Sequence, residues 1–287
     1  MQVDLLAGTV YAPATMTTRS PIILVFDSGL GGLTVFAEVA KARPDARFVY
    51  AADDAGFPYG RLSEEALVAR VRAVMDRLIA RHAPDLVVIA CNTASTLVLG
   101  PLRRRFSIPF VGTVPAIKPA AEQSRSKRIT MLATPGTVAR DYTRDLIQTY
   151  AADCRVNLVG SRRLAALAEA QLAGAPPAEA DLRAELDPCF VADEGGRTDV
   201  VALSCTHYPL LLERLRPLAP WPVTWLDPAP AIARRVVQLL GQPGRIPMDD
   251  AEALAVFTGG SGLTPALRQA LAARGLIRIG VEALPVA

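Results

Sequence analysis

Two nine-residue stretches of the chain share one pattern, and this repetition constrains the fold more than any other feature. Residues 85–93 and 199–207 each contain an aspartate, four apolar residues, one small residue, then a cysteine and two polar residues. A continuous apolar run rich in valine is typical of a strand that is buried on both faces of a parallel sheet. Cys91 and Cys205 therefore come directly after two buried strands, where open α/β sheets place their ligands.

The equivalent positions of the two cysteines are more informative than either cysteine alone. A single cysteine after an apolar run is most often a small buried hydrophobe. Two cysteines at equivalent positions, each followed by polar residues, favour instead two thiols that face one cleft. Strands also alternate with amphipathic helices elsewhere, as in residues 63–82, where apolar residues recur at helical spacing. This alternation predicts an α/β fold with mainly parallel sheets.

The turns after the first strand of each repeat also correspond. Residues 27–29 (Asp-Ser-Gly) follow an apolar strand, and residues 134–136 (Thr-Pro-Gly) follow another. The glycines after Asp27 permit a tight turn before a helix predicted at 33–42, and either Asp27 or Ser28 could cap that helix. The free N–H groups at such a helix start would suit a carboxylate or phosphate.

The chain of 287 residues is long enough for two domains of ordinary size. We predict a first α/β domain from residues 22–114 plus 225–287 and a second from 115–224, with the active site in the cleft between them. Residues 1–21 show no clear period, and we expect them to form a disordered N-terminal extension.

The composition argues against several classes of protein. A net charge of +3 gives no reason to expect binding to nucleic acid or to a membrane surface. No apolar run reaches the roughly 18 residues of a membrane helix, and the N-terminus lacks the features of a signal peptide. Four cysteines without a CxxC, and only two histidines, argue against a metal site and a disulfide framework. We therefore expect a reducing compartment.

The sequence lacks the motifs of two common classes of cofactor-dependent enzyme. A pyridoxal enzyme needs a lysine for its Schiff base, and none of Lys41, Lys118 and Lys127 follows a strand beside a glycine-rich loop. The dinucleotide motif GxGxxG is absent after the first strand. We therefore predict that the protein uses no cofactor.

Two facing thiols without these partners indicate proton transfer, because redox pairs are more often adjacent as CxxC. A substrate carbon between them can lose a proton to one thiol and gain a proton from the other, which inverts the stereocentre when the thiols lie on opposite faces. One cysteine must then be a thiolate, although a free thiol has a pKa of about 8.5. His207 lies close to Cys205 in the chain, and Asp27 could lie near Cys91 through paired strand ends.

Four ordered blocks of the sequence resemble the signature segments of glutamate racemases, which belong to the aspartate/glutamate racemase superfamily. The blocks are residues 26–32, 58–60, 90–95 and 205–210. The resemblance covers about residues 22–240, which is most of the chain.

The resemblance implies two pseudo-symmetric, flavodoxin-like domains. It also implies cofactor-independent interconversion of L-glutamate and D-glutamate in the cytoplasm, which supplies D-glutamate for peptidoglycan synthesis. The implied partners are glutamate, a second copy in a homodimer and, for some members with an N-terminal extension, an activating cell-wall precursor. A racemase for aspartate or another amino acid of the superfamily remains an alternative, as does a second role as a DNA gyrase inhibitor.

The resemblance also assigns roles to individual residues. Cys91 would deprotonate the D isomer, and Cys205 would deprotonate the L isomer. The residues that match the assisting acid–base groups are Asp27, Asp53, Glu169 and His207. Glu169 belongs to a loosely matching block and would also fit a solvent-facing helix position. The residues that match substrate-binding positions are Asp27, Ser28, Tyr59, Gly60, Asn92, Thr93, Thr206 and His207.

Overall fold

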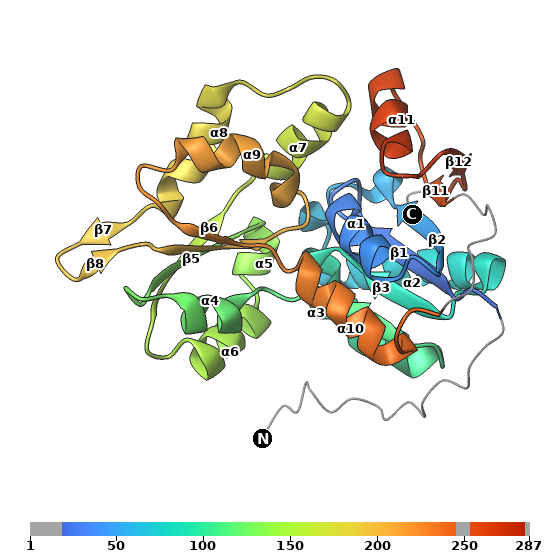
Figure 1. Cartoon of the computed structure of the whole chain (residues 1–287), viewed down its shortest axis with the longest axis horizontal. Helices are drawn as coiled ribbons and strands as arrows, with labels where there is room; N and C mark the ends of the chain where they lie inside the picture. Colours follow the sequence, from blue (N-terminus) through green and yellow to red (C-terminus); the bar gives the residue numbers. More distant parts are fainter. Residues whose placement is uncertain (1–18, 245–252, 285–287) are drawn as a thin grey trace.

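The computed structural model describes residues 19–244 and 253–284, and its long strands form two separate sheets (Figure 1). One sheet has six strands in the order β12-β11-β2-β1-β3-β4, and the other has four in the order β10-β9-β5-β6. All pairings within these two sheets are parallel. The predicted α/β fold with mainly parallel sheets is confirmed. The extension expected to be disordered falls largely in residues 1–18, outside the described residues.

The six-stranded sheet and the helices on its two faces are called the first unit. Its strands are β1 (Ile22–Asp27), β2 (Arg47–Ala52), β3 (Leu86–Ile89), β4 (Phe110–Gly112), β11 (Leu254–Phe257) and β12 (Arg278–Val281). Its helices are α1 (Leu33–Ala42), α2 (Glu64–His82), α3 (Asn92–Arg105), α10 (Ala229–Leu240) and α11 (Pro265–Ala272). Residues alternate along β1, so that Ile23 and Val25 pack with α1, α10 and α11, whereas Leu24 and Phe26 pack with α2 and α3. The unit therefore has three layers, with the sheet in the middle.

The four-stranded sheet and its helices are called the second unit. Its strands are β5 (Arg128–Ala133), β6 (Arg155–Gly160), β9 (Val200–Ser204) and β10 (Thr224–Leu226). Its helices are α4 (Ile117–Gln123), α5 (Pro135–Val138), α6 (Asp141–Tyr150), α7 (Leu164–Leu172), α8 (Glu179–Leu186) and α9 (Leu212–Leu215). A small antiparallel hairpin of β7 (Ala192–Asp193) and β8 (Gly196–Arg197) extends from it (Figure 1). Residues of α4 and α6 pack on one face of the sheet, and residues of α7, α8 and α9 pack on the other.

The four core strands of the two units have the same order. In the first unit the order is β2-β1-β3-β4, and in the second it is β6-β5-β9-β10, so that the second, first, third and fourth strands of each unit lie side by side. This is the order of flavodoxin-like sheets, which bind ligands where the order reverses between the first and third strands. Cys91 follows β3 and Cys205 follows β9, so both cysteines lie at that point of their own sheet.

The sequence pattern predicts a helix over residues 94–106 that is interrupted near Gly100 and Pro101, and a side-chain cap on the helix at 33–42; the structure corrects both predictions. The helix after Cys91 begins at Asn92, with Cys91 as its N-cap residue, and it continues through Pro101 without interruption. Buried Val98 and Leu102 hold this helix against the core, and this packing outweighs the hydrogen bond that a proline removes. Helix α1 has no side-chain cap, because a carboxylate oxygen of Asp27 accepts instead from the N–H of Gly29 at 3.2 Å.

Two other boundaries differ from the sequence expectation. The sequence pattern predicts a helix over residues 178–192, but helix α8 ends at Leu186, where the Asp187–Cys189 3₁₀ turn leads into the hairpin. Trp225 and Leu226 pair with β9, so the chain leaves the second sheet after residue 226 and not after 224. Among the helices of residues 19–244 and 253–284, none combines the length and the apolar character needed to span a bilayer.

Candidate active site

Cys91 and Cys205 line one small cavity between the two units. Each cysteine is 6% exposed. The cavity is lined by Ser28, Phe57, Pro58, Tyr59, Gly60, Cys91, Asn92, Thr93, Thr134, Ala165, Cys205, Thr206 and His207. Its volume of about 30 Å³ leaves room for water but not for an amino acid. Both thiols therefore line the same cavity, and that cavity is closed to a molecule of this size.

The surroundings of Cys91 favour a neutral thiol. Its Sγ donates to Ser28 Oγ over 3.7 Å. Burial, followed by the negative charge of Asp27, raises the pKa of Cys91 to about 12. Asp27 is fully buried at the end of β1, and its Oδ1 accepts from the Thr206 hydroxyl at 3.2 Å. Cys91 can therefore act as a proton donor at neutral pH.

The surroundings of Cys205 are different. His207 Nδ1 lies 3.8 Å from the Sγ of Cys205, and His207 Nε2 lies 2.9 Å from Glu169 Oε1. Burial opposes the charged imidazolium, but the hydrogen bonds with Cys205 and Glu169 outweigh it and raise the pKa of His207 well above its usual value. A cationic imidazole beside a cysteine favours the thiolate form.

Glu169 belongs to the second unit but also contacts the first. Its Oε1 accepts from the backbone N–H of Leu30 at 2.8 Å, in addition to its contact with His207. A Cβ on Gly29 would lie 2.0 Å from this oxygen, and a Cβ on Gly31 would lie 2.4 Å from His207 Nδ1. The glycines thus let the two units approach closely. The alternative of a solvent-facing Glu169 does not hold, since its carboxylate faces the other unit.

Asp53 is not part of the cavity lining. It is fully buried, and its carboxylate accepts from Arg70 at 2.5 and 2.6 Å, from the Thr258 hydroxyl at 2.6 Å and from the Tyr59 hydroxyl at 2.5 Å. Tyr59 does line the cavity. The structure therefore brings Asp53 to a cavity side chain and not to either cysteine.

The remaining lining is polar and partly unsatisfied. Asn92 is 2% exposed, and neither atom of its side-chain amide has a hydrogen-bond partner in the described part of the chain. Thr93 Oγ1 lies 3.2 Å from Thr134 Oγ1 and 3.3 Å from Thr137 Oγ1, so three hydroxyls from both units meet. The sequence reasoning did not name Thr134 or Thr137 as site residues, although it noted that residues 134–136 correspond to residues 27–29.

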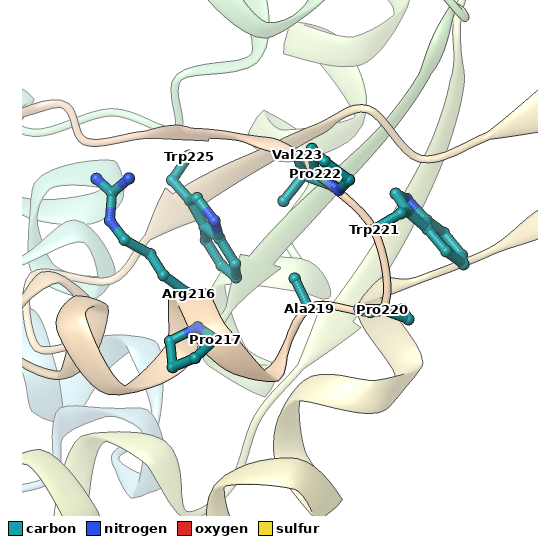
Figure 2. A pocket seen from close by; sticks show the side chains of 8 residues that line it. All are labelled: Arg216, Pro217, Ala219, Pro220, Trp221, Pro222, Val223 and Trp225. Atoms are coloured by element: carbon teal, nitrogen blue, oxygen red, sulfur yellow. The ribbon is translucent and has the colours of Figure 1, made fainter.

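A larger, open hollow of about 440 Å³ lies on the second unit, as Figure 2 shows. It is lined by Arg216, Pro217, Ala219, Pro220, Trp221, Pro222, Val223 and Trp225, and it shares none of these with the cysteine cavity. Within residues 19–244 and 253–284, no three histidine, cysteine or acidic side chains are grouped so as to hold a metal ion.

The chain is similar to known proteins in both sequence and structure. The family model described as Asp/Glu/Hydantoin racemase matches residues 29–236. A glutamate racemase of Brucella canis is 57% identical over 256 residues, which are 88% of this chain and 91% of that protein. Among solved structures, Escherichia coli glutamate racemase has a TM-score of 0.84 at 38% identity and covers 93% of this chain and 100% of its own. A glutamate racemase isoform from Bacillus anthracis has a TM-score of 0.72 at 26% identity, covering 94% and 98%. The chain belongs to the Asp/Glu/hydantoin racemase family and, within it, to the glutamate racemases.

Proposed function

We propose that this chain interconverts L-glutamate and D-glutamate by passing protons between Cα and two cysteines, without a cofactor. The observation that carries the proposal is that Cys91 and Cys205 line the same cavity from two different sheets. The product D-glutamate would supply peptidoglycan synthesis in the cytoplasm, as in the glutamate racemase family.

The unequal surroundings of the two thiols assign a direction to the described state. Cys91 is a thiol here, with its pKa raised to about 12, whereas Cys205 lies beside the His207 imidazolium. Cys205 then takes the Cα proton of L-glutamate, and Cys91 gives its proton to the opposite face of the carbanion, which yields D-glutamate. Cys205 ends as the thiol and Cys91 as the thiolate. D-glutamate reacts with this second form by the same steps in reverse.

The polar lining supports the binding of a dicarboxylate. The amide of Asn92 is buried without a partner, which is costly unless a ligand uses it. Together with the hydroxyls of Ser28 and Thr206 and the first turn of α3, it is available to the α-carboxylate, where charge develops as the proton leaves. The hydroxyls of Thr93 and Thr134, with the adjacent Thr137, would hold the distal carboxylate. Tyr59 and Gly60 complete this wall of the cavity.

Substrate entry requires the two units to separate, because the cavity is smaller than glutamate. The polar contacts that would break include those of Glu169 with Leu30 and of Thr206 with Asp27, and the ion pair of Arg140 with Glu64. Closure over the bound substrate then excludes water, which strengthens every hydrogen bond to the developing charge.

An exchange experiment in heavy water tests the reaction and the substrate together. The full-length protein is incubated with each glutamate isomer, and in parallel with each aspartate isomer, without added cofactor. We expect deuterium at Cα in the isomer formed from glutamate and a much slower reaction with aspartate. Faster turnover of aspartate would support the alternative substrate, and product without deuterium would contradict proton exchange with cysteines.

Two further expectations concern partners. The structure of the E. coli relative is described in complex with L-glutamate and the activator UDP-MurNAc-ala. We propose that a UDP-linked muramyl precursor also activates this chain, and that the chain forms a homodimer. Racemisation rates with and without the precursor test the first, and light scattering tests the second.

A further inference from the structure

Tyr208 carries a buried hydroxyl group that the reaction scheme above does not use. The residue is 0% exposed, and its Oη has no hydrogen-bond partner within the described residues. Buried polar groups in native proteins are nearly always paired, so an unpaired one points to a strained or catalytic group. A phenylalanine at this position would avoid the free-energy cost of burying an unpaired hydroxyl, so the presence of the hydroxyl calls for an explanation.

The local fold places Tyr208 next to Cys205. The backbone N–H of Tyr208 donates to the carbonyl of Cys205 at 3.1 Å, which closes a turn between them. The two side chains belong to the same buried cluster, with Leu182 and Leu186 of α8. Burial, followed by negative charge on Cys205, raises the pKa of Tyr208 well above its usual value. The tyrosine therefore keeps its proton and remains a donor.

Ser161 is the competing neighbour of the Tyr208 hydroxyl. Its Oγ already donates to Glu185 Oε2 at 2.6 Å and accepts from the N–H of Leu164 at 3.1 Å. Because the Ser161 hydroxyl already donates its proton to Glu185, it does not also donate a hydrogen bond to the Tyr208 hydroxyl. The Cys205 sulfur, once charged, is the stronger acceptor, since hydrogen bonds to an ionised group are about twice as strong as neutral ones.

We propose that the Tyr208 hydroxyl donates a hydrogen bond to the Cys205 thiolate and is a catalytic residue of the racemase. No proton is transferred in this step. The thiolate then has two donors, His207 and Tyr208, and the buried Tyr208 hydroxyl, which has no partner among the described residues, gains one. The groups that face Cys205 directly or through one neighbour are His207, Tyr208, Asp27, Cys91, Glu169, Ser161 and Glu185. The proposal rests on the assignment of Cys205 as a base.

The test compares Tyr208→Phe with the native protein by alkylation with iodoacetamide over a range of pH, with each cysteine followed separately by peptide mass spectrometry. We expect the alkylation profile of Cys205 to move to higher pH by about one unit, since that is the size of one charge-assisted hydrogen bond. The profile of Cys91, which is equally exposed, should stay in place and serves as an internal control.

Racemisation and melting provide the second readout. We expect kcat/KM to fall about tenfold, equally for both isomers because enantiomers have equal free energy, while the melting temperature is unchanged or higher. Tyr142→Phe, on α6, is the matched control and should change neither. An unmoved Cys205 profile, or an equal movement of Cys91, would overturn the proposal, as would a lower melting temperature with an unmoved profile. Alkylation needs no substrate, so this failure is distinct from a failure of the racemase assignment, which Cys205→Ala tests.

Discussion

The Cys91 half and the Cys205 half of the cavity have equivalent backbones and opposite electrostatics. Each cysteine follows the third strand of its unit, yet Cys91 lies near the Asp27 carboxylate and Cys205 lies near the His207 imidazole. Two identical surroundings would give both sulfurs the same protonation state. The repeat supplies two sulfurs on one cavity, and in the proposed reaction the side chains that break the repeat are what would make one sulfur an acid and the other a base.

The support behind the two halves also differs. On the Cys91 side, the cavity wall at Tyr59 is fixed by the buried carboxylate of Asp53, which Arg70 and Thr258 hold. On the Cys205 side, the sulfur and the Tyr208 ring rest against an apolar cluster. We infer that a buried carboxylate supports the wall at Tyr59, whereas the Cys205 sulfur has apolar packing behind it and the polar contacts of His207 and Thr206 beside it.

The largest expected effect comes from removing one sulfur at a time. Cys91→Ala and Cys205→Ala should each reduce racemisation by about 10²–10⁴-fold, the usual contribution of a positioned acid or base. The comparison becomes sharper in heavy water: Cys91→Ala should still exchange the Cα proton of L-glutamate, and Cys205→Ala that of D-glutamate. Proton NMR of each isomer measures this.

Cys154→Ala is the control, because Cys154 is a free cysteine outside the cavity and should leave both rates unchanged. Equal exchange of both isomers by either active-site variant would contradict the division into an acid half and a base half. Full turnover in either variant would remove the two-base assignment altogether.

A smaller effect is expected from preventing the two halves from meeting. In Gly31→Ala the new Cβ would lie 2.4 Å from His207 Nδ1 and 2.6 Å from Thr206 Oγ1, so the closed state is blocked. We expect kcat/KM to fall about 10²-fold, as for a misplacement of about 1 Å. Solution scattering should show that glutamate compacts the native protein but not this variant.

Gly136→Ala is the matched control for that substitution. Its added Cβ would lie 3.8 Å from Gly60, which is an ordinary contact. Both activity and compaction should survive. Normal activity in Gly31→Ala would mean that catalysis does not need the contact between the glycine-rich turn and His207.

The next effect tests the charge beside Cys205. Glu169→Gln keeps the shape of the side chain but removes the anion that helps to raise the pKa of His207. The pKa of His207 should then fall, so the imidazolium is lost at lower pH and the alkaline limb of the pH–rate profile moves down. A fall of about one pKa unit should give about a tenfold loss of kcat on the alkaline side of the profile, above the native pKa of His207.

Proton NMR can follow this directly, because the chain contains only two histidines. The second pair, His82 with Glu282 at 3.1 Å, lies away from the cavity, so Glu282→Gln is the control and should leave the profile unchanged. An unmoved His207 titration in Glu169→Gln would show that this carboxylate does not set the charge near Cys205.

These comparisons also explain which features the sequence could predict. The strands before Cys91 and Cys205 were predictable because their apolar runs and following turns are local patterns. The start of α3 was missed because Cys91, and not a serine, threonine or aspartate, is its N-cap. Strand β12 was missed because it is a four-residue edge strand with half-exposed side chains, which no alternation marks.

The placement of side chains from distant elements depended on tertiary contacts. Glu169 reaches the first unit because the end of α7 docks on α11, where Thr264 Oγ1 donates to the carbonyl of Ala173 at 3.3 Å. Nothing near Glu169 in the sequence reports this docking. Thr134 and Thr137 could have been predicted as site residues, because their turn corresponds to the turn at Asp27. The correspondence alone does not show which side chains of the turn reach the cavity.

The smallest effect concerns the polar support of the Cys91 half. Thr258→Val keeps the size of a side chain that is 4% exposed but removes one donor to Asp53, which retains Arg70 and Tyr59. The free energy of unfolding measured in urea should fall by about 1–3 kcal/mol, because part of a buried charge loses its partner, while kcat changes little. Thr224→Val, on the exposed edge strand β10, should stay within about 0.5 kcal/mol. If Thr258→Val were neutral or stabilising, Asp53 would not depend on this contact, and the apolar cluster that contains Tyr59 would hold that wall instead.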